Sequence, residues 1–225
     1  MKVEGSMMNK VIAEAANQIC GLKKANRALI VGINGVDTSG KTDFAIKLEE
    51  ELSKRGHEIL IVQAKDFYNP KSYRYSSVDE VENYYNRTIS FRRLIHEVLE
   101  PIKSEGAMNR EVLLLDVETD QYSIVKRYVA DQSTIVLVEG RFLFRKKLND
   151  YFDYKIFLNI SFDEMIKRAE TIDMPRIGNR KDVMERFEKK CVLAQKYYID
   201  QCDPVGRADF VIDATDLGNL VVEKV

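Results

Sequence analysis

The sequence predicts an α/β fold in which helices cover both faces of a mostly parallel sheet. Short runs rich in Val, Ile, Leu and Phe alternate along the chain with amphipathic stretches of helical period. The runs are nearly continuous in apolar residues, as is typical of strands that are buried on both faces. The length of 225 residues, with 45% apolar and 32% charged residues, fits one domain.

The expected elements follow this alternation. The expected strands are Ala28–Asn34, Glu58–Gln63, Glu111–Val117, Thr134–Val138, Tyr154–Ile160 and Asp209–Ala214. The expected helices are Met8–Leu22, Lys41–Arg55, Ser90–Lys103, Phe144–Phe152, Ser161–Glu170 and Lys181–Gln201. Residues 1–27 are expected to form a helical N-terminal extension. Residues 69–88 and 171–180 fit neither period, and irregular stretches of this length are often substrate loops or lids, here an acceptor-side loop and a lid.

Composition excludes several classes of function. The 35 basic and 36 acidic residues give a formal charge of -1, so no positive excess is available to bind nucleic acid. Three widely spaced cysteines predict neither a disulfide framework nor a zinc site, which favours a reducing cytoplasm. No run approaches the about 20 apolar residues of a membrane helix, so no membrane partner is expected. Assembly into a homo-oligomer stays open.

A phosphate-binding loop is predicted between the first strand and the helix that follows it. Residues 35–42, Gly-Val-Asp-Thr-Ser-Gly-Lys-Thr, match G-x-x-x-x-G-K-[ST] in the strand-to-helix context that this motif requires. Glycines let successive N–H groups point inward, and the helix adds its positive dipole end. The lysine would reach the β- and γ-phosphates of ATP, and the threonine hydroxyl would bind Mg²⁺. The expected nucleotide-binding residues are Gly35, Val36, Asp37, Thr38, Ser39, Gly40, Lys41, Thr42 and the adjacent Asp43.

Three acidic residues follow predicted strands, at the sheet edge where open α/β sheets bind ligands. Asp66 follows the second strand and is a candidate base that accepts the proton of an attacking hydroxyl, or else it caps a turn. Glu139 ends a strand that carries no other charge, and is a candidate Mg²⁺ ligand or a buried helix cap. Asp116 is a candidate acceptor contact. The candidate metal set is Thr42, Glu139 and Asp66.

Three arginines lie around a break between two predicted helices. Arg168, Arg176 and Arg180 flank a segment that contains proline and glycine. Arginines that close over phosphates neutralise the transferring group and exclude water, so the set suits a catalytic lid. The alternative is that each arginine lies on a solvated helix face.

Several segments, in the same order, resemble the uridine kinase-like family of P-loop kinases over roughly residues 28–216. Besides the phosphate loop, they are Asp66-Phe-Tyr-Asn-Pro70, Tyr84-Tyr-Asn-Arg87, Val138-Glu-Gly-Arg-Phe-Leu-Phe144, Tyr154-Lys-Ile-Phe-Leu158, Cys202-Asp-Pro204 and Ala208-Asp-Phe-Val-Ile-Asp213. The resemblance implies a P-loop NTPase sandwich with a five-stranded parallel core. It also implies Asp66 as catalytic base, Thr42 and Glu139 at the metal, Arg176 in the lid and Arg168 near the adenine.

The acceptor side departs from that family. Uridine kinases carry a lid of Arg-Gly-Arg, whereas Arg176 is followed here by Ile177-Gly178. They also carry histidines that grip the pyrimidine and ribose, whereas this chain has Leu115-Asp116-Val117 and then Asp120. An aromatic wall for another ring is a further expectation. Its candidate residues are Tyr68, Tyr73, Tyr75, Tyr84 and Tyr85.

Together these residues predict a kinase that transfers the γ-phosphate of MgATP to a hydroxyl of a small, nucleoside-like metabolite. Lys41, Asp66, Arg176 and Arg180 are the expected catalytic residues. A sugar, a sugar phosphate or a vitamin precursor is the alternative acceptor. A nucleotide-binding regulatory module without catalysis is the alternative from another class. A base, a metal acid and lid arginines together favour catalysis, since a mere binder has no need of all three.

Overall fold

The computed structural model describes residues 4–22 and 26–225, and the side chains it describes leave out those of residues 4–6, 173–177 and 180. Its main sheet has six strands in the order β2-β5-β1-β6-β7-β8. The strands are β1 (Leu29–Gly35), β2 (Ile59–Gln63), β5 (Ile135–Gly140), β6 (Tyr154–Asn159), β7 (Phe210–Asp213) and β8 (Val221–Lys224). The first five are parallel and β8 is antiparallel to β7. The predicted five-stranded parallel core is therefore confirmed, with one further strand at its edge.

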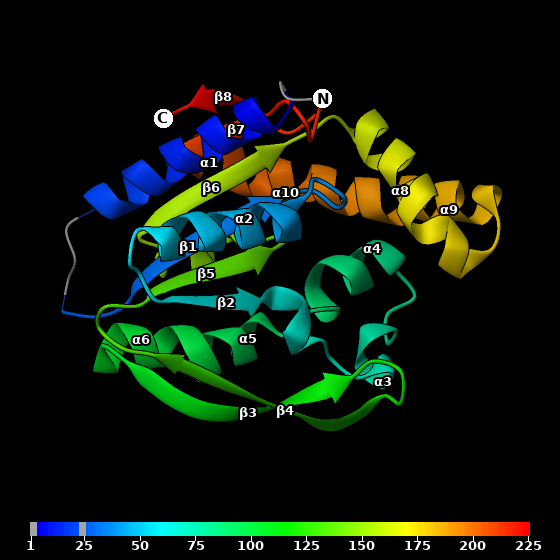
Figure 1. Ribbon diagram of the computed structural model, residues 1–225. Helices are drawn as coiled ribbons and strands as arrows, with labels where there is room; N and C mark the ends of the chain where they lie inside the picture. Colours follow the sequence, from blue (N-terminus) through cyan, green and yellow to red (C-terminus); the bar gives the residue numbers. More distant parts are fainter. Residues whose placement is uncertain (1–3, 23–25) are drawn as a thin grey trace.

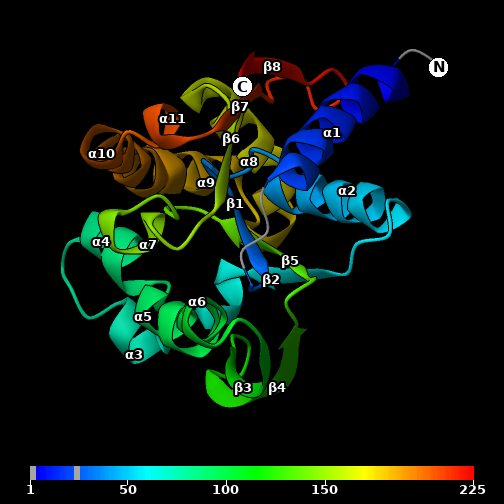
Figure 2. The ribbon, with the colours of Figure 1, turned by 90° about the vertical axis from the view of Figure 1, so that its left-hand side faces the viewer.

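Helices cover both faces of this sheet (Figure 1). The longer ones are α1 (Glu4–Gly21), α2 (Lys41–Lys54), α8 (Phe162–Ile177) and α10 (Leu193–Cys202). The shorter ones are η1 (Ala64–Phe67), α3 (Lys71–Arg74), α4 (Glu80–Glu82), η2 (Asn83–Arg87), α5 (Phe91–Leu94), η3 (Ile95–Leu99), α6 (Glu100–Glu105), α7 (Lys146–Asn149), α9 (Arg180–Arg186), η4 (Phe187–Val192) and α11 (Pro204–Arg207). Figure 2 shows α1 and α2 on one side of the sheet and α10 and α11 on the other.

The central strands are buried as the sequence predicted. Every residue of β1 and of β5 is buried, because helices cover both sides of the sheet centre. On one side, α2 contacts β1, β2 and β5, and α1 lies against α2. In the part of the chain that the structure describes, no helix is both long and apolar enough to cross a membrane.

One predicted core strand belongs elsewhere. The run at Glu111–Val117 lies in β3 (Met108–Asp116), which pairs antiparallel with β4 (Gln121–Ala130) in a separate two-stranded sheet. Its burial alternates, with Val112 and Leu114 buried and Leu113 48% exposed. Only one face of β3 is therefore packed. The prediction was wrong because a continuous run of leucines is also typical of a strand that is buried on both faces. The strand β4 was not predicted.

The two segments expected to be irregular are largely helical. Residues 69–88 contain α3, α4 and η2, and the Asp79 carboxylate caps α4 by accepting from Val81 N at 2.8 Å. In residues 171–180, α8 continues to Ile177, and the break is confined to Gly178 and Asn179. Gly178 has φ of +89°, which glycine adopts without strain. Lid and loop roles for these segments stay predictions.

A partly buried carboxylate joins the start of β1 to the start of β6. Asp153 receives two hydrogen bonds from Arg27, at 2.5 and 2.7 Å, one from Ile30 N at 2.8 Å and one from Lys103 at 3.1 Å. Burial raises the pKa of Asp153, but these hydrogen bonds and the charge of Lys103 outweigh burial and lower it overall.

The lowered pKa predicts a pH-dependent contribution to stability. Because Asp153 loses its proton more easily in the folded chain, its contribution is complete above the unfolded-state pKa of about 3.9 and is lost as pH falls through the lower folded-state pKa. We expect Asp153→Asn to lower the free energy of unfolding by about 2 kcal/mol at pH 7. Urea unfolding from pH 7 to pH 2.5 measures this difference, which should shrink in the acid range. A difference that is constant with pH would contradict the assignment.

Candidate active site

Three neighbouring strands bring the predicted active-site segments to one edge of the sheet. In the parallel register, Glu139 of β5 lies beside Ile33 of β1 and beside Gln63 of β2. The phosphate loop follows β1, and Asp66 lies in η1, directly after β2. The loop, Glu139 and Asp66 therefore meet at the carboxyl ends of parallel strands, where open α/β sheets bind their ligands.

The phosphate loop has the backbone that its glycines permit. Gly40 has φ of +88° and immediately precedes α2, so the N-terminal amides of this 14-residue helix open onto the loop. At Gly35, a Cβ atom would lie 2.6 Å from the carbonyl oxygen of Leu158, so a larger residue would displace β6. The two glycines of the motif are thus required for different reasons, a positive φ and a close approach of strands.

Lys41 lies within the loop that it is expected to serve. Its ammonium group donates to the carbonyl of Val36 at 2.6 Å. Burial lowers the pKa of Lys41, and the negative charges of Asp37 and Glu139 offset this only in part. A buried ammonium group held at the centre of the loop is suited to neutralise phosphate charge.

Thr42 and Glu139, which the sequence assigned to Mg²⁺, are in contact. The Thr42 hydroxyl donates to Glu139 Oε1 at 3.0 Å, and Glu139 is 4% exposed. Among the described residues, no three His, Cys, Asp or Glu side chains form a metal-binding group. Mg²⁺ commonly takes one or two protein ligands and completes its shell with water and phosphate oxygens, which this pair fits.

Asp37 carries a largely buried carboxylate, 16% exposed, inside the phosphate loop. It accepts hydrogen bonds from the Tyr84 hydroxyl at 2.5 Å and from Gln195 Nε2 at 3.2 Å, and lies 3.5 Å from Arg141 Nη1. Burial raises the pKa of Asp37, but the charges of Arg141 and Lys41 and the two hydrogen bonds lower it overall. The negative charge of Asp37 is therefore balanced by nearby positive charges and by hydrogen bonds.

Arg141 is a charged residue beside the phosphate loop that the sequence analysis did not single out. It follows Glu139 and Gly140 at the end of β5, and its guanidinium lies 4.3 Å from the ring centre of Tyr84 and 5.9 Å from that of Tyr68. Burial opposes its charge, but the neighbouring Tyr84, Tyr68 and Asp37 raise its pKa above the usual value. An arginine two residues after the strand-end acid Glu139 was the available signal, and its partner Asp37 is distant in sequence.

Asp66 is positioned by the hairpin. Its Oδ2 accepts from Lys126 Nζ at 2.7 Å and from the Tyr128 hydroxyl at 3.0 Å, both from β4. The ring of Phe67 stacks on that of Tyr128, with centroids 6.3 Å apart. In the described part of the chain no hydrogen bond reaches the other oxygen, Oδ1, which leaves it available to a ligand. The sequence did not identify Lys126 or Tyr128, since β4 itself was not predicted.

Asp116 does not lie at the carboxyl edge of the parallel sheet. It is the last residue of β3, and its carboxylate accepts from Glu118 N at 2.9 Å within the hairpin turn. This backbone hydrogen bond lowers its pKa. We therefore correct the strand-edge placement of Asp116, because β3 is not part of the main sheet.

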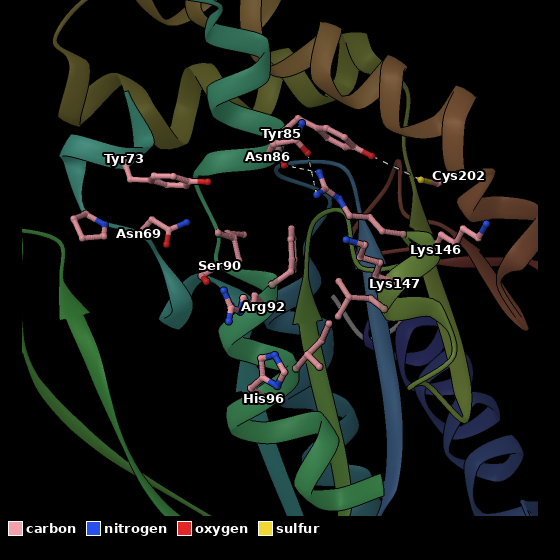
Figure 3. A pocket seen from close by; sticks show the side chains of 16 residues that line it. Asn69, Tyr73, Tyr85, Asn86, Ser90, Arg92, His96, Lys146, Lys147 and Cys202 are labelled. Atoms are coloured by element: carbon pink, nitrogen blue, oxygen red, sulfur yellow. Dashed lines mark hydrogen bonds between the residues drawn. The ribbon is translucent and has the colours of Figure 1, made fainter. Parts of the chain in front are cut away.

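The predicted aromatic wall is divided between two cavities. Tyr68, Tyr75 and Tyr84 line a cavity of about 790 Å³ that also touches Asp37 and Thr38, and we call it the tyrosine cavity. Tyr73 and Tyr85 line a different cavity of about 850 Å³ (Figure 3). Consecutive helical residues face different directions, so Tyr84 and Tyr85 separate. Of the five tyrosines, Tyr73 and Tyr85 therefore do not line the cavity that touches the phosphate loop.

The predicted adenine-side residue, Arg168, lines a cleft that is separate from the tyrosine cavity. Arg168 donates to the carbonyls of Thr38 at 3.2 Å, Ala214 at 2.7 Å and Thr215 at 2.8 Å. It lines a cleft of about 430 Å³ together with Gly40, Lys41, Thr42 and the exposed Asp43. Arg168 therefore links the loop to the segment after β7. The lid arginines Arg176 and Arg180 lie outside the described side chains.

The fold and the phosphate loop define the class, a P-loop kinase fold. No family model matches the sequence. The chain is 28% identical over 148 residues to human nicotinamide riboside kinase 1, a match that spans 64% of this chain and 65% of that enzyme. The chain thus spans slightly less than two thirds of the length of this relative.

Solved structures of kinases have a fold similar to that of this chain. A possible uridine kinase from Bacillus stearothermophilus is 25% identical, with a TM-score of 0.70, covering 91% of this chain and 98% of that one. A D-glycerate 3-kinase from Cryptococcus neoformans shares the fold at 12% identity, with a TM-score of 0.61 and coverage of 99% and 100%. These comparisons confirm the resemblance to the uridine kinase-like P-loop kinases in sequence and fold.

A double-mutant cycle tests the pair of Asp37 and Arg141. Arg141→Met leaves a buried carboxylate without its guanidinium, so we expect a loss of about 3 to 5 kcal/mol of stability. Adding Asp37→Asn removes that uncompensated charge and should recover more than about 1 kcal/mol. Urea unfolding measures both. The control is Arg110→Met, because Arg110 is a 43% exposed arginine paired with Glu105 and should change stability by less than about 1 kcal/mol. Strictly additive losses would refute the coupling.

Proposed function

We propose that this protein is a kinase that transfers the γ-phosphate of ATP to a hydroxyl of a small, nucleoside-like metabolite. The observation that carries the proposal is the meeting of the phosphate loop, Glu139 and Asp66 at three adjacent strand ends. A protein that only binds nucleotide needs the loop, but it has no need of a carboxylate positioned to receive a proton. The similarity to human nicotinamide riboside kinase 1 supports a nucleoside-like acceptor.

Each residue has a role that follows from its contacts. Lys41 and the loop amides bind the phosphates, and Lys41 exchanges its hydrogen bond with Val36 for phosphate oxygens. Thr42 and Glu139 hold Mg²⁺, which neutralises charge on the phosphates when bound. Asp66 accepts the proton of the attacking hydroxyl at Oδ1, while Lys126 and Tyr128 fix its orientation through Oδ2.

The proposed base is tested by Asp66→Asn, which keeps the shape of the side chain but cannot accept the proton. We expect turnover with any accepted substrate to fall by about 10²- to 10⁴-fold. The Kd for MgATP should change little, because among the described residues Asp66 makes no hydrogen bond or ion pair with the phosphate loop. ADP release across a panel of nucleosides, sugars and vitamin precursors measures turnover, and calorimetry measures binding. Asp163→Asn, an exposed carboxylate on α8, is the control.

The outcome separates the proposal from its alternatives. Acceptor-dependent turnover that Asp66→Asn removes supports a kinase, and the panel identifies whether nucleosides or other hydroxylated metabolites are used. Firm MgATP binding without turnover on any acceptor would instead indicate a regulatory module. Lys41→Ala should lose MgATP binding in either case, since it removes the buried ammonium group of the loop.

The proposed metal role is tested by Glu139→Gln, which removes the charge beside Thr42. We expect the Mg²⁺ concentration for half-maximal activity to rise about tenfold or more, because a charged ligand is replaced by a neutral one. Titrating Mg²⁺ at saturating ATP measures this value. The matched control is Glu111→Gln, an exposed carboxylate on β3. An unchanged Mg²⁺ requirement would leave Glu139 as a buried helix cap.

A further inference from the structure

The tyrosine cavity contains a buried arginine whose donors are unused. Arg74, at the end of α3, is 9% exposed, and its guanidinium lies 5.5 Å from the ring centres of both Tyr68 and Tyr75. Within the described residues, no atom accepts a hydrogen bond from this side chain, and its Nε is buried without a partner. A guanidinium has five N–H donors, and leaving even one of them, here Nε, buried without an acceptor is costly.

The one carboxylate near Arg74 does not explain its burial. Asp120 Oδ1 lies 3.7 Å from Arg74 Nη2, which is too far for a hydrogen bond. Both Asp120 oxygens instead accept from Lys71 N, at 2.9 and 3.1 Å. Asp120 therefore forms an ion pair with Arg74 but accepts no hydrogen bond from it, and the guanidinium has no hydrogen-bond acceptor among the described residues.

The charge of the cavity wall favours an anion. Lys65, Arg74, Arg141, Arg186 and Lys190 line the cavity, against the carboxylates of Asp37 and Glu80. Asp37 pairs with Arg141, and Glu80 lies 3.9 Å from Lys190. Three basic side chains of the wall thus have no carboxylate partner on the same wall. Phosphates of ATP lie at the loop end, where Asp37 and Thr38 border the cavity, whereas Arg74 belongs to a separate helix.

The position of Arg74 relative to Asp66 suits the two ends of one acceptor. Tyr68 follows Asp66 by two residues, and two guanidinium groups lie near its ring centre, that of Arg141 at 5.9 Å and that of Arg74 at 5.5 Å. Arg141 marks the end of the cavity that adjoins the phosphate loop, through Asp37. Arg74, on α3, approaches the same ring without an ion pair or hydrogen bond to the phosphate loop among the described residues. An acceptor that stacks on Tyr68 would meet Arg74 with the part that is not phosphorylated.

We propose that Arg74 binds an anionic group of the acceptor, so that the substrate is a hydroxylated small molecule that carries a carboxylate or a phosphate. The identity of the ligand as an acceptor rests on the proposed kinase function, whereas the anion site itself does not. The planar fork of arginine matches the two oxygens of either group, and its stacking on Tyr68 and Tyr75 keeps the fork in one orientation.

Matched compounds that differ in charge test this proposal. One pair is nicotinamide riboside and nicotinic acid riboside, in which an amide is replaced by a carboxylate. The other is ribose and ribose 5-phosphate, in which a phosphate is added. For each pair, kcat/KM is measured by ADP release and Kd by calorimetry, with the parent chain and with Arg74→Gln. Arg92→Gln is the control, since Arg92 is exposed and lines the cavity of Figure 3 instead.

We expect the parent chain to prefer the anionic member of at least one pair by about tenfold to a hundredfold, the effect of a charge-assisted hydrogen bond. The pair that shows the preference distinguishes carboxylate from phosphate. Arg74→Gln should reduce the preference at least about tenfold, Arg74→Lys should restore part of it, and Arg92→Gln should preserve it.

The two readouts separate this inference from the kinase proposal. Anionic compounds that bind through Arg74 without being phosphorylated support the anion site and overturn the kinase. If the neutral member of each pair is phosphorylated with the same kcat/KM as its anionic partner, the anion site is overturned and the kinase proposal stands. Failure of both anionic probes to bind at millimolar concentration also overturns the anion site. Equal loss for both members of a pair in Arg74→Gln, with a lowered unfolding midpoint, shows a structural role only.

Discussion

The compensation of one buried charge underlies the arrangement of this site. Asp37 places a carboxylate inside a loop built to hold phosphates, where an uncompensated negative charge would repel them. At 3.5 Å, the attraction between Asp37 and Arg141 amounts to about 5 kcal/mol at the effective dielectric constant found near protein sites. The desolvation of two ions costs several kcal/mol each. The pair alone therefore does not stabilise the loop, and the hydrogen bonds from Tyr84 and Gln195 are needed as well.

The partners of Asp37 connect distant parts of the chain. Tyr84 comes from η2, Arg141 from the end of β5 and Gln195 from α10. Each partner is correctly placed only when its own element is packed, so the loop is ordered by the assembled fold and not by its local sequence. Two of these residues, Tyr84 and Arg141, also line the tyrosine cavity. The phosphate side and the acceptor side of the site consequently share one set of charges.

Local patterns predicted the parts of the fold that depend on local sequence. The continuous apolar runs of β1 and β5, the glycines of the loop and the strand-end carboxylates Asp66 and Glu139 were all predicted, because strand burial and backbone conformation leave a signal in neighbouring residues. The run at Glu111–Val117 misled, since three consecutive leucines hid an alternation that only the antiparallel pairing with β4 reveals. Thr42 was assigned from the loop motif and Glu139 from its place at a strand end, and the structure shows the two in contact.

The parts that were missed depend on side chains distant in sequence. Lys126 and Tyr128 lie about 60 residues after Asp66, with separations of 60 and 62 positions. The hairpin thus has a function that its sequence does not show, because it holds one carboxylate oxygen and leaves the other available. Arg74 presents the reverse case, a side chain that the fold buries without a hydrogen-bond acceptor among the described residues. Folding tolerates such a cost where a ligand later compensates it, and for this reason an unsatisfied guanidinium in a cavity gives information on the ligand that a satisfied one does not.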